Sequence, residues 1–174
     1  MSDSVAIPLN IVRADVVRDF ARSELFDRTF KEGMALVEET AAYLDGEGRR
    51  DSRMLDRDTA LAYAGESMRL TTRLMQIASW LLVQRAVREG DMDAAEACQD
   101  RYRVTQIVAH NPATPSDGST LPEGLLVLLD RATRLYERVT YLDQRMFADD
   151  SAAAPEALNP VLTQMQRLQE AFGG

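Results

Sequence analysis

The sequence feature that most constrains the fold is the run from Glu66 to Glu89, ESMRLTTRLMQIASWLLVQRAVRE. Its pattern is helical and it is apolar on more than one side, because Gln76, Ser79 and the ring nitrogen of Trp80 are the polar interruptions between Leu74 and Val83. A helix with so wide an apolar surface has to be covered on several sides. Its apolar stretch from Leu74 to Val83 is flanked by arginines and is shorter than the roughly 20 apolar residues that cross a membrane. We therefore expect the central helix of a bundle.

We expect this helix to begin near Asp56 to Asp58 and to end at Gly90. Two apolar seams run along its length. The carboxylates suit the positive end of a helix. About thirty residues would give a rod of roughly 45 Å. The first seam consists of Leu61, Ala64, Met68, Thr71, Met75, Ala78, Leu82 and Arg85. The second consists of Leu70, Leu74, Ile77 and Leu81.

Three further helices are predicted from residue spacing. The first runs from Ser23, a suitable N-cap, to Asp45, with Gly46 as its C-cap. Its apolar residues recur at steps of three and four: Phe26, Phe30, Met34, Val37, Ala41 and Leu44. The next runs from the capping box Asp93–Glu96 to about Ala109, and the last from the capping box Thr120–Glu123 to about Phe147. The inner face of the former would be Cys98, Tyr102, Thr105 and Val108.

The two ends of the chain differ from the centre. We expect a weakly ordered leader over residues 1–22, a helical bundle over residues 23–147, and a flexible acidic linker and amphipathic tail over residues 148–174. The tail carries Leu162, Met165, Leu168 and Phe172 at helical spacing. Because a helix this short is marginal alone, we expect the tail to order on docking to a groove. The predicted fold is all-α: an elongated antiparallel bundle of three long helices and one shorter helix, with a flexible C-terminal tail.

Charge and cysteine content limit the classes of function and the cell compartment that suit this chain. The chain has a net charge of −8, which argues against direct binding to nucleic acid. Cys98 is the only cysteine, so no disulfide forms within the chain and a reducing compartment fits. The N-terminus does not resemble a secretory signal. We expect a cytoplasmic protein without a membrane span.

Residues for catalysis or metal binding are scarce. One histidine, His110, and one cysteine cannot supply the ligands of a usual zinc site, and the Glu-x-x-His pairs of di-iron bundles are missing. A phosphotransfer histidine would sit in mid-helix beside basic residues, whereas His110 directly precedes Asn111-Pro112. Cys98 is interpreted as a buried structural residue. We expect neither an enzyme nor a cofactor, and we keep a histidine phosphotransfer-type protein as a minor alternative.

A polar stripe on the central helix is the candidate contact surface. Tryptophan and arginine are the residues most enriched at interface hot spots. The stripe consists of Arg69, Arg73, Gln76, Trp80, Gln84 and Arg88. Two interpretations stay open: Trp80 packs beneath a neighbouring helix of its own chain, or the stripe is an interface, with a homodimer as the first candidate.

Two long segments resemble the RcdA (regulator of CtrA degradation) family of alphaproteobacteria, formerly a domain of unknown function. They are SELFDRTFKEGMALVEETAAYLDGEGRRDS over residues 23–52 and YAGESMRLTTRLMQIASWLLVQRAVREG over residues 63–90. These are long words of mixed residues and cover about a third of the chain, so the resemblance is specific.

The resemblance implies a non-enzymatic adaptor: a dimeric helical bundle that delivers cell-cycle regulators to the protease ClpXP primed by CpdR. It implies TacA-like cargo and, together with PopA, CtrA-like cargo. We expect a homodimer that is cytoplasmic and is recruited to a cell pole. A structural dimerisation or signalling scaffold is the alternative.

Overall fold

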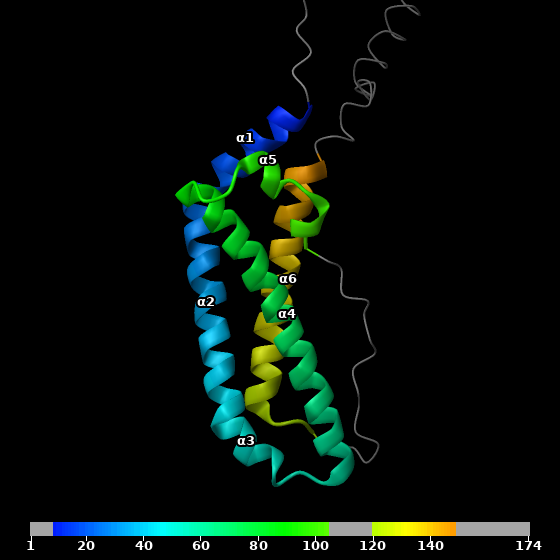
Figure 1. The fold of residues 1–174 in the computed structure, drawn as a ribbon. Coiled ribbons are helices and arrows are strands. Elements are labelled where there is room, and N and C mark those ends of the chain that lie inside the picture. Colours follow the sequence, from blue (N-terminus) through cyan, green and yellow to red (C-terminus); the bar gives the residue numbers. More distant parts are fainter. Residues whose placement is uncertain (1–8, 105–119, 149–174) are drawn as a thin grey trace, which may run out of the picture.

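The computed structural model describes residues 9–104 and 120–148. Three long helices, α2 (Glu24–Asp45), α4 (Arg57–Glu89) and α6 (Glu123–Ala148), form the body of the bundle (Figure 1). The short α3 (Glu47–Ser52) joins α2 to α4. The expected all-α bundle of three long helices is confirmed.

The helix ends follow the local sequence. The Ser23 hydroxyl accepts a hydrogen bond from the Phe26 amide at 3.1 Å, as expected of an N-cap. The Asp56 carboxylate accepts from the amides of Asp58 and Thr59 at the start of α4. That helix ends at Gly90, whose φ of 83° lies in the left-handed region that favours glycine. The predicted bounds of the helices α2 and α4 are therefore confirmed.

Helix α4 and helix α6 run in the same direction, and α2 runs opposite to both (Figure 1). Arg73 of α4 contacts Thr133 of α6, and Trp80, two turns further on, contacts Asp143. Where the three helices meet, Gly33 of α2 leaves room for neighbours, since a Cβ there would lie 2.6 Å from Cδ1 of Leu81. The antiparallel packing expected for the bundle therefore holds for α2 against each of the other two long helices.

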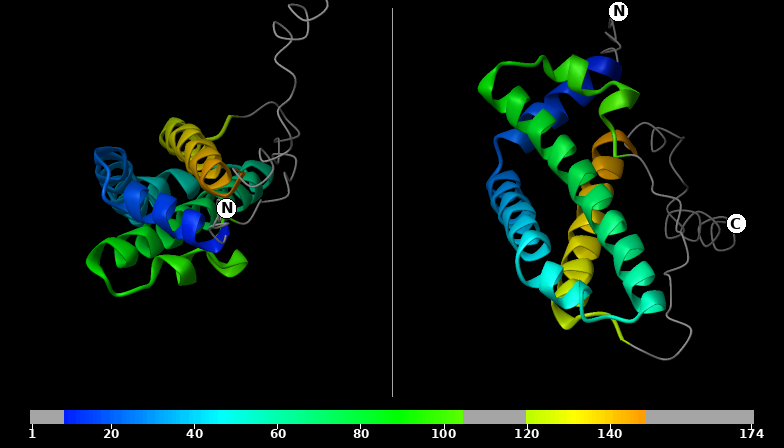
Figure 2. Two further views of the ribbon diagram at one scale, coloured as in Figure 1. Left: turned by 90° about the horizontal axis from the view of Figure 1, so that it is seen from above. Right: turned by 60° about the horizontal axis from the view of Figure 1, so that its bottom comes forward.

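The first helix, α1 (Leu9–Ala21), was not expected. The sequence pattern indicates a weakly ordered leader over residues 1–22, but within its described part Val17 and Ala21 are fully buried. The Phe20 ring lies 5.6 Å from the Trp80 ring and 5.9 Å from the Phe26 ring. Helix α1 lies across one end of the bundle, as Figure 2 shows from above. The shorter fourth helix of the bundle is therefore α1, and not the segment from Asp93 to about Ala109.

The helix predicted from Asp93 to about Ala109 is much shorter. Its N-cap is correct, since the Asp93 carboxylate accepts from the Ala95 amide, but α5 ends at Ala97 (Ala94–Ala97). A 3-10 turn, η1 (Asp100–Tyr102), follows, and the chain then extends through Arg103 and Val104. Four residues gain little helix stability alone. The segment instead crosses to α6, where Arg103 pairs with Asp143. Thr105, Val108 and His110 lie outside the described residues.

Candidate functional site

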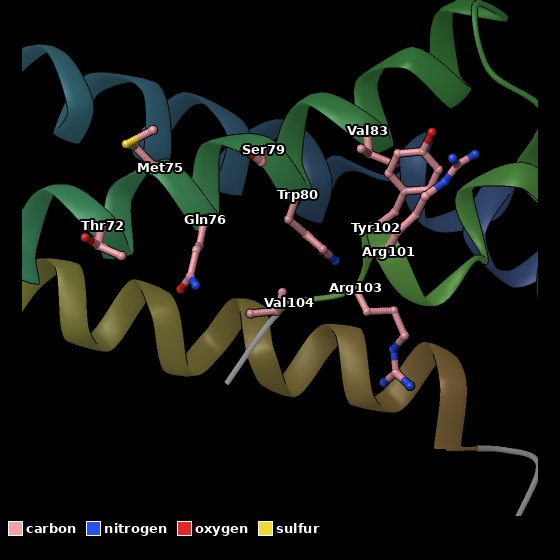
Figure 3. A pocket seen from close by; sticks show the side chains of 10 residues that line it. All are labelled: Thr72, Met75, Gln76, Ser79, Trp80, Val83, Arg101, Tyr102, Arg103 and Val104. Carbon is pink, nitrogen blue, oxygen red and sulfur yellow. The ribbon is translucent and has the colours of Figure 1, made fainter. Parts of the chain in front are cut away.

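The predicted polar stripe of α4 is used within the chain. Trp80 and Gln84 are buried. Arg73 donates from Nη1 to the Thr133 hydroxyl at 2.5 Å, and Arg88 pairs with Asp27 of α2. Figure 3 shows Gln76 and Trp80 pointing from α4 toward α6. Trp80 therefore packs beneath its own chain, whereas Arg88 at the end of the stripe is exposed.

Trp80 is held by Asp143, a buried carboxylate of α6. The indole Nε1 donates to Oδ1 at 3.0 Å, and Arg103 donates to Oδ2 from Nε and Nη2 at 3.3 and 3.2 Å. The Arg103 guanidinium also lies 4.4 Å from the centre of the Phe147 ring. Burial raises the pKa of Asp143, while the Trp80 hydrogen bond and the Arg103 charge oppose the rise. This group joins α4, α6 and the segment after η1.

A second polar group lies nearer the start of α4. Glu66 is buried and pairs with Arg69 at 2.5 Å. Burial lowers the pKa of Arg73, and the nearby Arg69 charge lowers it further. Buried ion pairs contribute little net stability but are costly to break. Arg69 and Arg73 of the predicted stripe therefore have partners within the chain.

A pocket of about 390 Å³ opens between α4 and the segment after α5 (Figure 3). Gln76, Trp80 and Val83 line it from α4, and Tyr102 and Arg103 from the other side. The described residues that line it include no carboxylate, histidine or cysteine. This lining carries the hydroxyls of Thr72 and Ser79 but no general base to activate them.

The first predicted seam of α4 is the exposed surface instead. Leu61, Met68, Met75 and Leu82 have exposed fractions of 75%, 72%, 65% and 50%. The second seam is buried: Leu70, Leu74, Ile77 and Leu81 all belong to the core. The sequence signal for both was the same helical repeat, so it did not tell which seam other parts of the chain would cover.

The edge of α2 next to this surface is also partly open. The residues buried from α2 are Phe26, Thr29, Gly33, Leu36 and Thr40. Except for Phe26, the predicted inner face is rotated toward solvent: Phe30, Met34, Val37 and Leu44 are half-buried and Ala41 is exposed. The exposed apolar surface of α4 therefore continues onto α2.

The remaining candidate residues are Cys98, His110 and the apolar residues of the tail. Cys98 is a free, half-buried thiol, and burial raises its pKa, which keeps it in the less reactive protonated form. Leu162, Met165, Leu168 and Phe172 of the tail lie outside the described residues, as does His110. In the described ranges, no group of three or more acidic, histidine or cysteine side chains is placed to hold a metal ion.

None of the helices described is long and apolar enough to cross a membrane. Among curated proteins, no significant match is found.

Two comparisons place the chain. The model of the family "Protein of unknown function (DUF1465)" matches residues 17–172. Among solved structures, RcdA from Caulobacter crescentus CB15 is 63% identical, with a TM-score of 0.61, over 74% of this chain and 96% of that chain. The protein therefore belongs to the DUF1465 family, the family of RcdA.

Proposed function

We propose that this protein is a non-enzymatic adaptor that delivers protein substrates to an ATP-dependent protease. The observation that carries the proposal is the 63% identity to RcdA over 96% of that chain. A scaffold with an exposed apolar face suits a protein that works by contact. The pocket beside Trp80 gives no reason to assign a reaction.

The finer proposal follows the family resemblance. The protease is ClpXP primed by CpdR, and the cargo is TacA-like or, with PopA, CtrA-like. The adaptor acts as a homodimer in the cytoplasm and is recruited to a cell pole. It does not bind nucleic acid directly, in keeping with a net charge of −8.

A reconstituted degradation assay tests the adaptor function. Purified ClpXP, CpdR and a TacA-like substrate are incubated with and without this protein, and the loss of substrate is followed. We expect faster degradation with the protein present, and a parallel reaction without CpdR to show no acceleration. A substrate set whose degradation rates all stay unchanged would contradict the proposal.

The exposed face of α2 and α4 also supports a structural dimerisation module as a second candidate. Such a module would dimerise without altering the degradation of any substrate. A phosphotransfer protein, in contrast, would lose its activity on His110→Ala, which an adaptor should tolerate.

A further inference from the structure

The pocket between α4 and the segment after α5, which we call the Trp80 pocket, contains a polar atom without a partner. Gln76 lines the pocket and points from α4 toward α6 (Figure 3). Its side-chain oxygen Oε1 is buried, and no described residue donates a hydrogen bond to it. A buried acceptor without a donor is costly. Gln76 Oε1 therefore marks a position where a donor from another molecule fits.

The charged groups of the Trp80 pocket are positive. Its described lining contains the guanidinium groups of Arg101 and Arg103 and no carboxylate. Arg103 is paired with Asp143. The side chain of Arg101 is 62% exposed, and it lies 3.6 Å from the Glu96 carboxylate, which is too long for a hydrogen bond. The charge of Arg101 is therefore available to an anionic group at the edge of the pocket.

The rest of the lining is largely apolar and is held in place. Val83 lies on the α4 side and the Tyr102 ring on the other (Figure 3). Trp80 is fixed by its hydrogen bond to Asp143. The volume of about 390 Å³ is at the lower end of the ~300–1,000 Å³ typical of ligand sites. Since an α-helix is at least ~10 Å across, the pocket suits the side chains of an extended segment better than a helix.

We propose that the Trp80 pocket binds an extended acidic segment of a partner protein. A large apolar side chain of the segment enters between Val83 and Tyr102, and a backbone N–H donates to Gln76 Oε1. A neighbouring carboxylate pairs with Arg101. Consecutive residues of an extended peptide carry these three groups, and the lining offers a site for each. The inference rests on the proposed function, because it gives a protein that works by contact one contact site.

A selection from random peptides tests the Trp80 pocket. A phage-displayed library is selected on the full-length protein, and the recovered peptides are measured against two variants with unchanged circular dichroism spectra. Ser79 is exposed and lines the pocket, so Ser79→Phe fills the space without touching the core. Ala35→Phe adds the same ring at an exposed position of α2 outside the pocket and is the matched control.

We expect the recovered peptides to carry a large apolar residue next to aspartate or glutamate. They should bind wild type and Ala35→Phe alike and bind Ser79→Phe about tenfold or more weakly. A selection that yields no binding peptide, yields basic peptides, or yields peptides that bind Ser79→Phe as well as wild type overturns the inference.

The fluorescence of Trp80 reports whether the pocket is occupied, because it is the only tryptophan of the chain. A recovered peptide without tryptophan should change the emission along the same curve as its binding. A peptide that binds without this change contacts another surface, which contradicts the proposal. Phenylacetate, which has a ring and a carboxylate but no backbone N–H, is titrated in parallel. If phenylacetate saturates the change and no peptide does, the pocket belongs to a small aromatic anion and the proposal is wrong.

Gln76→Met separates binding from a structural role. Since no described residue donates to Oε1, methionine of similar length should leave urea unfolding unchanged or shift it to higher urea. The same variant should bind the peptide about threefold to tenfold more weakly, the effect of one lost hydrogen bond. A variant that unfolds more easily and binds the peptide normally would contradict the role of Gln76 in binding.

Arg101→Glu tests the charge at the edge of the pocket. Reversing this exposed charge should weaken binding of the acidic peptide, and the difference from wild type should shrink at high salt. Arg134→Glu makes the same change at a side chain of α6 that is 77% exposed, and it should bind as wild type does. Equal losses in the two variants would show a general effect of net charge and would remove Arg101 from the site.

The degradation assay, run on Ser79→Phe and Ala35→Phe, keeps the two proposals separate. Pocket-dependent peptide binding by a protein that accelerates no degradation leaves the present inference standing and removes the adaptor function. A protein that delivers substrate but binds no peptide in the pocket keeps the adaptor function and removes the present inference.

Discussion

Asp143 joins parts of the chain that are far apart in sequence. Its two oxygens accept from Trp80 of α4 and from Arg103 after η1, and the residue itself belongs to α6. A buried carboxylate without such partners would be costly. The same contacts explain why Trp80 lies beneath its own chain instead of forming a hot spot for a partner.

The pH dependence of stability should report on Asp143. Burial raises its pKa in the folded protein, while an aspartate in the unfolded chain titrates near 3.9 (roughly). The folded state therefore holds the proton of Asp143 to higher pH than the unfolded state does. The stability that Asp143 contributes is complete below the pKa of the unfolded chain, and it is lost as the pH rises through the raised pKa of the folded protein. Asp143→Asn removes this titration but keeps an acceptor for Trp80.

We therefore expect the unfolding free energy of wild type, minus that of Asp143→Asn, to fall as the pH rises from about 4 toward neutrality. Urea unfolding at a series of pH values measures both proteins. A difference that grows with pH would show that the Arg103 charge outweighs burial at this carboxylate.

The partner of Trp80 could not be predicted from the sequence, and the reason is physical. Its partner Asp143 is 63 residues away, and helical periodicity reports the spacing along one helix, not the element that covers it. Asp143 itself falls on the polar side of the predicted last helix, among arginines, so no local signal marked it as buried.

At the level of elements, capping chemistry was predictable. Ser23, Asp93 and Gly90 are local signals, because the cap bonds are made within a few residues of each. The lengths of α1 and α5 were not predictable in this way. Helix α1 is stabilised by Phe20 against Trp80, and the chain after α5 by Arg103 against Asp143, so both depend on tertiary contacts.

The end of α4 gives a prediction at this level. Gly90 adopts a φ of 83°, where a side chain crowds the backbone but open space surrounds the Cβ position. We expect Gly90→Ala to lower the free energy of unfolding by about 1 kcal/mol. Gly90→Asn is the matched control and should cost less, since asparagine tolerates the left-handed region better. Equal costs in urea unfolding would argue against backbone strain as the cause.

At the level of the whole molecule, the described bundle has its own core. Residues from α1, α2, α4 and α6 supply the fully buried side chains, among them Val17, Leu36, Ile77 and Leu135. The described residues leave the first seam of α4 exposed at Leu61, Met68, Met75 and Leu82. Both seams of α4 were visible in the sequence, but only the three-dimensional packing told which of them was covered.

The tail over residues 149–174 is expected to be dispensable for folding. Because residues 9–104 and 120–148 form a hydrophobic core among themselves, we expect a protein cut after Ala148 to keep its melting temperature and circular dichroism spectrum. If the tail is a docking element, the cut abolishes delivery of at least one cargo in the reconstituted degradation assay. A full-length Leu162→Asp/Leu168→Asp variant should reproduce that loss, because both residues lie on the predicted apolar face. Thr163→Asp/Gln166→Asp adds the same charge off that face and should deliver normally. Undiminished delivery of every cargo by the shortened protein would rule out a docking role for the tail.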